Sequence, residues 1–487
     1  MIFRPGFVHG RPRGASRPCW YVDSANGDDA NSGRSPASAL RSIGAAQARL
    51  SAGDTLALAR GSHWREQLTI PAEGIEVEAY GAGDKPLLDA SDVIDPAAWT
   101  KTPGFEDVYE AVLPVLQMGT QTFPGLWEDG VWLGYRTSTA AVDAEAGTYF
   151  PAGLGGEPAS PMTVYIHTSD GSDPRTNGRR YEYSRREAGL KSRFPVKVSG
   201  VHTRRNCATP GSLIVGPNSH VEDCLASDGT FHNVYACGGC YLKNVEARNA
   251  YHYDSLAMFV FFDDAAAGED ITLEDCWAHM DSIPGPIAQS PLGFYGHSAA
   301  GIYGTITYRR CRTTGLNSGL SAGNAARCVL DGCTVEGAQW PYSVNCAESE
   351  VTGCSAVGGP ISRVLSTNNG TGLNITVRNF ALVDSPEVGC EGFFAPGPDV
   401  SLDISDSTFG PIAWSASAAR AKLRCHRMTF RGTYYYYMDV APVDAFEVES
   451  DYNHFDANGN GLFRWRGVEY TLGAWRAATG QDIHSEA

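Results

Sequence analysis

The chain has 487 residues, of which 38 are basic and 55 acidic, so its formal net charge at pH 7 is −17. With 43% hydrophobic and 19% charged residues it has enough apolar material to bury, which excludes an intrinsically disordered chain. An acidic protein has no electrostatic reason to bind DNA, RNA or an anionic bilayer. We therefore expect no nucleic-acid partner and no membrane insertion.

The first residues, MIFRPGFVHGRPRG, lack the apolar segment of a secretory signal, and residues 1–20 are predicted to be an N-terminal arm. The longest apolar run, Leu256 to Phe262, is far shorter than the roughly 20 residues that span a bilayer. We expect a protein that stays inside the cell, leaves it by lysis or within a particle, or has lost its leader.

Residues 21–90 are predicted to form an N-terminal cap and the first coils of a repeat. An amphipathic helix is expected over SALRSIGAAQARL, Ser38 to Leu50, because its apolar residues share one face. The segments GDTLALARG and QLTIPAEGIEVEAYG, which follow it, are typical of strands.

The loop DSANGDDANSG, which precedes this helix, is rich in carboxylates. Asp23, Asp28 and Asp29 are candidate Ca²⁺ ligands, because hard cations prefer oxygen donors. The same residues are common in turns, so a loop without a metal is the alternative.

Short strand-like segments recur between residues 191 and 460. Five of them, in the motifs SHVEDC, ITLEDC, ITYRRC, CVLDGC and SEVTGC, end at Cys224, Cys276, Cys311, Cys333 and Cys354. Spacings of 21 to 35 residues, without helical or leucine-rich patterns, predict an all-β right-handed parallel β-helix with loop insertions. Stacked coils would align these thiols in an internal ladder rather than in disulfides or a metal site.

The lone CxxC, Cys237 to Cys240, has no second pair at zinc spacing, so a turn is expected there. Residues 461–487 are predicted to form a C-terminal cap, with a short helix around Ala474 to Ala478 that ends at Gly480.

The opening WYVDSANGDDANSGRSPASALRSIGAAQARLSAGDTLALARG resembles that of right-handed β-helix carbohydrate proteins, the group of polysaccharide lyases and phage tailspikes. The ending FEVESDYNHF…FRWRGVEYTLGAWRAATGQDIHS is similar to the close of the same group. LWEDGVWL, AGTYFPAG and MTVYIHTSDGSDP resemble a β-rich insertion of many members, here residues 91–190. The resemblance implies the fold, but the group mixes lyases, epimerases, glycosidases and viral spikes.

Long loops on a rigid scaffold often carry function, and the two longest spacings enclose a cluster of acids and histidines between residues 249 and 300. The candidate catalytic residues are Tyr295, His297, Asp263, Asp264, His252 and Arg309. A carboxylate pair would suit glycoside hydrolysis, and a Tyr–His pair, with Arg309 or a metal neutralising the carboxylate, would suit β-elimination on a uronic acid. Ca²⁺ binding by acidic residues, or hydrogen-bonded turns without a function, are the alternatives.

Aromatic residues beside polar neighbours suggest platforms for sugar rings or a protein interface. The candidate substrate-binding residues are Trp340, Tyr342, Tyr435, Tyr437, Trp127, His279 and Asp281. The net charge argues against a polyuronate substrate unless Ca²⁺ or an arginine-rich patch, such as Arg175 to Arg193, intervenes.

These observations predict a spike or fibre of a phage-like particle that binds host capsule or lipopolysaccharide, with or without depolymerase activity, forms a trimer and acts outside the cell. The alternatives are a secreted polysaccharide lyase or glycoside hydrolase, and a structural β-helix adaptor without a sugar site. No cofactor other than Ca²⁺ is expected.

Overall fold

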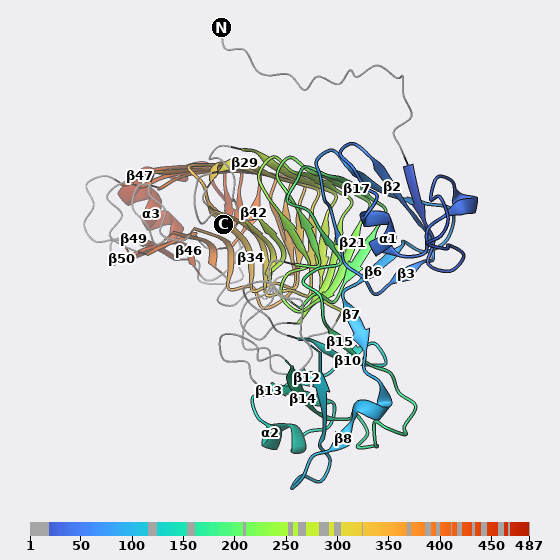
Figure 1. The fold of residues 1–487 in the computed structure, drawn as a ribbon. Helices are drawn as coiled ribbons and strands as arrows, with labels where there is room; N and C mark the ends of the chain where they lie inside the picture. Colours follow the sequence, from blue (N-terminus) through green and yellow to red (C-terminus); the bar gives the residue numbers. More distant parts are fainter. Residues whose placement is uncertain are drawn as a thin grey trace.

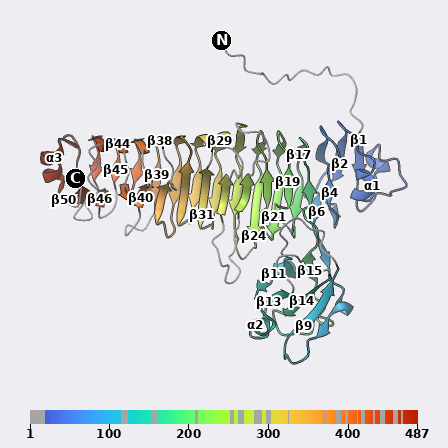
Figure 2. The same ribbon diagram turned by 60° about the vertical axis from the view of Figure 1, so that its left-hand side comes forward.

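A computed structural model shows three long parallel sheets that wind around one core, which confirms the predicted β-solenoid. It describes residues 19–114, 124–152, 161–207, 211–251, 257–261, 269–281, 292–296, 303–323, 325–367, 372–384, 391–395, 400–410, 412–415, 421–430, 434–439, 446–455, 462–465 and 468–486. Figure 1 shows the coils stacked in chain order, and Figure 2 shows the long axis of the stack.

Sheet A has 14 strands, and every pair in it is parallel. In spatial order they are β1 (Cys19–Val22), β2 (Thr55–Ala59), β5 (Glu76–Tyr80), β17 (Lys197–Ser199), β20 (His220–Glu222), β23 (Tyr241–Lys243), β26 (Ile271–Glu274), β29 (Tyr303–Arg309), β32 (Ala325–Asp331), β35 (Glu348–Thr352), β38 (Leu373–Arg378), β41 (Val400–Ser405), β44 (Ala421–His426) and β47 (Phe446–Asp451).

Sheet B has ten strands and carries the site described below. Its strands are β3 (His63–Trp64), β6 (Leu87–Asp89), β18 (His202–Arg204), β21 (Leu225–Gly229), β24 (Glu246–Ala250), β27 (Trp277–His279), β30 (Arg312–Thr314), β33 (Thr334–Glu336), β36 (Ser355–Val357) and β39 (Ala381–Val383). A three-stranded sheet follows along the chain, formed by β42 (Thr408–Phe409), β45 (Thr429–Phe430) and β48 (His454–Phe455).

Sheet C again has 14 strands, and only its last pair is antiparallel among the pairs described. Its strands are β4 (Leu68–Thr69), β16 (Leu190–Lys191), β19 (Leu213–Val215), β22 (Val234–Ala236), β25 (Ala257–Phe261), β28 (Leu292–Gly296), β31 (Ser318–Gly323), β34 (Trp340–Asn345), β37 (Arg363–Ser366), β40 (Glu391–Ala395), β43 (Ile412–Ser415), β46 (Tyr434–Asp439), β49 (Leu462–Trp465) and β50 (Val468–Tyr470).

The predicted thiol ladder is confirmed at the turn between sheets A and B. Cys224, Cys276, Cys311, Cys333 and Cys354 are all buried there and none forms a disulfide. Successive sulfurs donate to carbonyls of the preceding coil, as Cys276 does to Leu242 O at 3.6 Å and Cys311 to Leu273 O at 3.5 Å. The residue before each thiol takes a left-handed backbone, for example Asp275 at φ 54°, which explains why four of the five are Asp or Gly; the fifth is Arg310, at φ 51°.

Short helices lie at the two ends of the stack (Figure 1). The N-terminal helix α1 (Ile43–Gln47) is shorter than predicted, because Leu40 pairs with Val22 in a β-bridge and Ser42 caps the helix by accepting from Ala45 N at 3.1 Å. At the other end, α3 (Leu472–Thr479) ends at Gly480, at φ 68°, as predicted. No helix in the described part of the chain is long and apolar enough to cross a membrane.

Between β6 and β16 the chain leaves the solenoid and forms a β-rich lobe, here called the insertion, beneath the N-terminal half of the stack (Figure 2). Its strands form two sheets, one of β11 (Val131–Trp132), β10 (Leu126–Glu128), β15 (Tyr181–Ser184) and β7 (Ser91–Val93), the other of β12 (Gly134–Tyr135), β13 (Thr148–Ala152), β14 (Met162–His167), β9 (Tyr109–Leu113) and β8 (Thr100–Lys101). The helix α2 (Thr139–Asp143) and two 3₁₀ turns, η1 (Pro36–Ser38) and η2 (Pro96–Ala98), complete the elements.

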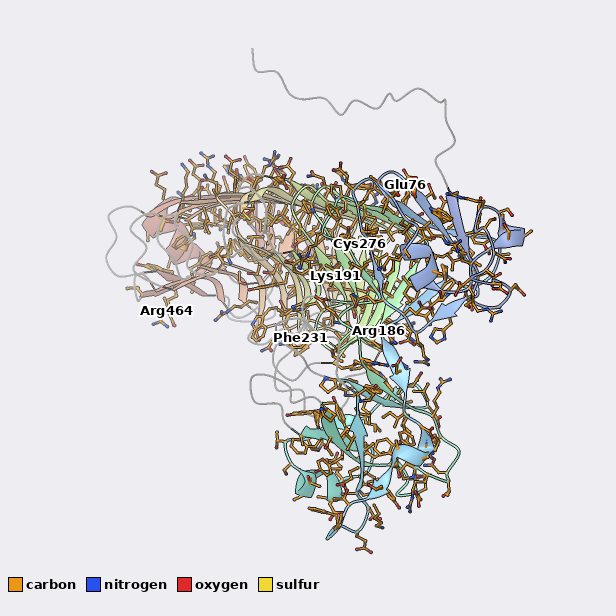
Figure 3. All side chains as sticks on the ribbon, viewed as in Figure 1. Glu76, Arg186, Lys191, Phe231, Cys276 and Arg464 are labelled. Atoms are coloured by element: carbon orange, nitrogen blue, oxygen red, sulfur yellow. The ribbon has the colours of Figure 1, made fainter. Side chains whose placement is uncertain are left out.

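The insertion has a hydrophobic core of its own, and two solenoid residues, Cys207 and Phe231, belong to it. In Figure 3, Phe231 and Arg186 lie where the insertion meets the solenoid. The insertion therefore packs against the turns that lead from sheet B to sheet C.

Candidate functional site

The outer face of sheet B carries a run of polar and aromatic side chains beside the insertion. Strand alternation buries Ala247 and Ala278 and turns their neighbours outward. The parallel register places Glu246 beside Trp277, and Arg248 beside His279. Residues of the same face therefore meet although they lie about one coil apart in sequence.

A histidine joins two carboxylates on this face. His279 Nε2 lies 3.0 Å from Glu246 Oε1, and His279 Nδ1 lies 3.2 Å from Asp281 Oδ1. His279 is nearly buried, whereas the Asp281 side chain is 58% exposed. A neutral imidazole can donate to only one of these carboxylates, but a protonated one can donate to both.

The turn from sheet B to sheet C brings further polar groups to the same place. Asn249 donates through Nδ2 to Asp281 Oδ2 at 3.1 Å and accepts from Asp281 N at 2.9 Å. Asn249 and Asp228 both take left-handed backbone, with φ of 52° and 53°, which turns the chain at the end of β24 and of β21. Arg248 Nε lies 4.0 Å from Asp281 Oδ2.

Tyr251 follows directly and faces the insertion. Burial raises the pKa of its phenol, and the charges of Asp228 and Asp281 raise it further. The hydroxyl is therefore protonated at neutral pH and can donate a hydrogen bond. We call Asp228, Glu246, Arg248, Tyr251, His279 and Asp281 the sheet B cluster.

Two stacked ring pairs border the sheet B cluster. Trp277 stacks on His279 with ring centroids 3.8 Å apart, and the Arg312 guanidinium lies 5.3 Å from the Trp277 ring centre. Tyr251 stacks on Trp132 of the insertion with centroids 4.7 Å apart. These pairs fix the side chains that flank the carboxylates.

The carboxylates of the cluster do not share one environment. The hydrogen bond from His279 outweighs desolvation and lowers the pKa of Glu246, so Glu246 is ionised at neutral pH.

One coil before β21, burial lowers the pKa of His202 to about 3, and the charges of Arg204 and Arg248 lower it as well. His202 is thus a neutral partner for Ser227, whose Oγ lies 2.9 Å from its Nε2.

Two buried carboxylates lie where the insertion joins the solenoid: Glu182 of the insertion pairs with arginines of the solenoid, and Asp89 of the solenoid accepts from Ser91 Oγ of the insertion at 2.6 Å. Asp89 accepts from Arg204 Nη2 at 2.7 Å, and Glu182 of the insertion accepts from Arg205 Nη1 at 2.7 Å. Arg65 donates to Glu182 and lies 3.6 Å from Asp89. Burial would raise the pKa of Asp89, but the hydrogen bond from His63 and the charges of Arg204 and Arg205 lower it well below its usual range. We call Asp89, Glu182 and these partners the junction ion-pair network.

The predicted catalytic residues are not brought together where the structure describes them. Tyr295 is half-buried in β28 of sheet C, whereas Arg309 in β29 of sheet A pairs with Glu274 and Asp331. Because these strands belong to different faces, the predicted cooperation of Tyr295 with Arg309 is wrong for this structure. The other four, His252, Asp263, Asp264 and His297, lie outside the described residues.

The predicted substrate-binding residues are divided between the core and the surface. His279 and Asp281 lie in the sheet B cluster. Trp340 is 38% exposed on sheet C, but Tyr342 and Trp127 are fully buried, so no sugar can stack on these two rings and that expectation is corrected. Tyr435 and Tyr437 belong to β46, and their side chains lie outside the described part of the structure.

The predicted Ca²⁺ ligands accept backbone hydrogen bonds, within local turns for Asp23 and Asp28 and from the residues before α1 for Asp29. Asp23 Oδ1 accepts from Ala25 N and Asn26 N, Asp28 Oδ1 accepts from Ala30 N, and Asp29 Oδ1 accepts from Arg41 N and Ser42 N. Among the described residues no group of three His, Cys, Asp or Glu side chains is placed to hold a metal ion.

Sequence reasoning missed Asp228, Glu246, Arg248 and Tyr251. A signal for two of them was present in the repeat itself, because Val245 and Cys276 occupy equivalent positions in the coil. Counting one residue onward from each aligns Glu246 with Trp277, and counting three aligns Arg248 with His279, as the register shows. Tyr251 had no such signal, since its partner Trp132 lies in the insertion.

No family model and no curated protein matches the chain. A solved complex of XylC with xylose has 11% sequence identity, covers 96% of this chain and 86% of that one, and gives a TM-score of 0.51. A glycoside hydrolase has 9% identity, 88% and 96% coverage, and a TM-score of 0.52. The tailspike of a Pseudomonas phage has 11% identity, 84% and 74% coverage, and a TM-score of only 0.28, which carries no argument. At these identities the similarity shows the fold alone.

Proposed function

We propose that this chain binds a glycan on the outer face of sheet B and hydrolyses a glycosidic bond there. The observation that carries the proposal is the placement of Glu246 and Asp281 on opposite sides of one imidazole, on an exposed face. Glycoside hydrolysis needs two carboxyl groups, one to protonate the leaving oxygen and one to activate water or attack the sugar.

The lowered pKa of Glu246 and the contact of Asp281 with His279 support different roles for the two carboxylates. Glu246, ionised because of the His279 hydrogen bond, takes a proton from the attacking water. Asp281, the second carboxyl group in contact with His279, receives a proton through the imidazole and gives it to the leaving oxygen as the bond between that oxygen and the anomeric carbon breaks. His279 contacts both groups, so it can return the proton from Glu246 to Asp281 after turnover.

The imidazole also keeps the two carboxylates apart. Inverting enzymes have their carboxyl groups about 6.5–9.5 Å apart so that water fits, whereas retaining enzymes have them about 5 Å apart. An intervening His279 ring favours the wider arrangement, and we therefore propose inversion at the anomeric carbon.

Net charge and the fold comparison suggest which glycans to test first. A protein of net charge −17 favours a neutral or mixed-charge glycan over a polyuronate. The fold is shared with a protein solved with xylose and with a glycoside hydrolase, so xylo-oligosaccharides and other neutral glycans are the first substrates to test.

The test measures the reducing ends that are released from xylo-oligosaccharides and other neutral glycans. It compares the unaltered chain with its Glu246→Gln and Asp281→Asn variants. We expect each variant to lose at least about 100-fold in kcat while still binding the glycan, because a general acid or base contributes about 10²–10⁴-fold. Glu350→Gln, an exposed glutamate on sheet A, serves as the matched control and should keep full activity. If the chain binds a glycan but releases no reducing ends, it is a glycan-binding protein and not a hydrolase. If it shows no glycan binding and no cleavage, the whole proposal is overturned.

A non-catalytic spike on a phage-like particle is the second candidate. The elongated solenoid in Figure 2 suits a fibre that presents one long face to a surface glycan. Cleavage that depends on Glu246 would favour the hydrolase, and glycan capture by the unaltered chain without cleavage would favour the spike.

A further inference from the structure

The insertion makes direct contact with the sheet B cluster through one ring. Tyr251 donates its backbone N–H to Gly229 O at 2.7 Å, which fixes its main chain to the preceding coil. Its side chain stacks on Trp132, from β11 of the insertion, with an interplanar angle of 16°. The main chain of Tyr251 is thus held by the solenoid, and its ring by the insertion.

Trp132 is in turn held by neighbours within the insertion. Its ring makes edge contacts with Trp127, at a centroid distance of 5.3 Å, and with Tyr149, at 5.5 Å. Such edge-to-face geometry is favourable beyond the area that it buries. The Trp132 ring therefore has a fixed orientation, unlike a side chain on a free hairpin.

The same contacts lead back to the junction ion-pair network. The Arg205 guanidinium lies 4.6 Å from the Trp127 ring centre and donates to Glu182. Arg205 itself has a left-handed backbone, at φ 61°, and is almost fully buried. An unbroken series of contacts thus joins the buried charges, the two tryptophans and the Tyr251 ring.

We propose that the insertion completes the active site, with Trp132 as a positioning residue that holds the ring of Tyr251, whose main chain is bonded to Gly229 next to Asp228. The hydroxyl then donates a hydrogen bond to the leaving oxygen or to Asp281 as charge shifts between them. This inference rests on the proposed hydrolysis for its kinetic consequence, but the placement of Tyr251 can be measured without it.

The first experiment observes Tyr251 directly. With 3-fluorotyrosine incorporated at position 251, the ¹⁹F resonance should show a ring-current shift from Trp132 that Trp132→Ala abolishes and Trp132→Phe partly restores. Val131→Ala, at the exposed neighbouring residue of the same strand, is the matched control and should leave the resonance in place. If Trp132→Ala does not fold, Trp132→Leu, which keeps much of the volume and removes the stack, replaces it. A resonance that Trp132 variants do not move would overturn the inference.

The second experiment measures kinetics on the substrate found above. Trp132→Ala should lower kcat by about 10- to 100-fold with KM little changed, because small misplacements of catalytic groups cost this much. Tyr251→Phe should lower kcat by a similar factor, and the double variant should be no slower than either. Additive losses, or a loss confined to KM, would overturn the positioning role. If the resonance behaves as expected but no glycan is cleaved, the proposed function fails and the placement of Tyr251 stands.

Discussion

At the scale of single residues, His279 sets the chemistry of the sheet B cluster. It contacts both Glu246 and Asp281, and its stack on Trp277 leaves it little freedom to turn away. The ionisation of Glu246 therefore depends on a neighbour that is itself fixed by packing. Such dependence is how a protein gives two carboxylates different roles.

The pH dependence of kcat/KM tests this coupling. Glu246 must be ionised to act as a base, and its pKa is lowered, so activity should fall only below the ordinary value for Glu, about 4.3. His279→Phe keeps an aromatic ring against Trp277 but removes the hydrogen bond, so the acidic limb should move up in pH. His220→Phe is the control, because His220 on sheet A also contacts a glutamate and a ring. An acidic limb that does not move in His279→Phe would contradict the assignment.

Sequence reasoning reached part of this cluster. His279 and Asp281 are two residues apart, and their types alone made them candidates for binding a substrate. Glu246 reaches His279 only through the register of β24 and β27, and Trp132 reaches Tyr251 across 119 residues of chain. The contact of Trp132 with Tyr251 depends on how the insertion packs against the solenoid, and no local pattern in the sequence encodes that packing.

At the scale of elements, the junction ion-pair network joins the insertion to the solenoid. Asp89 comes from β6 and Glu182 from β15, and both side chains are fully buried. Buried carboxylates persist only when cations and hydrogen bonds compensate for lost water, which Arg204 and Arg205 provide here. The network thus fixes the position of the insertion relative to the solenoid.

Asp89→Asn should lower the free energy of unfolding by about 3–5 kcal/mol, since it leaves buried guanidinium charge uncompensated. The pKa of Asp89 is lowered on folding, so its contribution is complete above the unfolded value of about 3.9 and is lost as pH falls through the folded value. The unaltered chain should therefore lose more stability below pH 4 than the variant does. Denaturant titrations followed by tryptophan fluorescence measure both.

Asp173→Asn is the control for this prediction, because Asp173 forms an exposed ion pair with Arg175 in the insertion. Exposed pairs contribute little, so its unfolding curve should match that of the unaltered chain. Equal effects of Asp89→Asn and Asp173→Asn would contradict the structural role of the network.

At the scale of the whole molecule, stacking of coils explains the composition. Each coil needs left-handed or tight turns between its strands, and Asp, Asn and Gly recur at these turns. The thiol ladder and the solenoid could be predicted because both follow from the repeat period. The length of α1 could not, because the pairing of Leu40 with Val22 is a tertiary contact.

The solenoid also provides the long outward face of sheet B on which the sheet B cluster lies. Successive coils carry outward side chains from His202 to Arg312 along one face of sheet B, next to the insertion. A face of this kind suits an extended glycan, with the carboxylates of the sheet B cluster beneath a single linkage.

The most direct test of the account is the anomeric configuration of the first product. ¹H NMR of a β-linked neutral oligosaccharide during hydrolysis by the unaltered chain should show the α-anomer appearing first, and Glu246→Gln should show neither anomer. A first product of β configuration, or unchanged hydrolysis in Glu246→Gln, would contradict the proposed roles of Glu246 and Asp281.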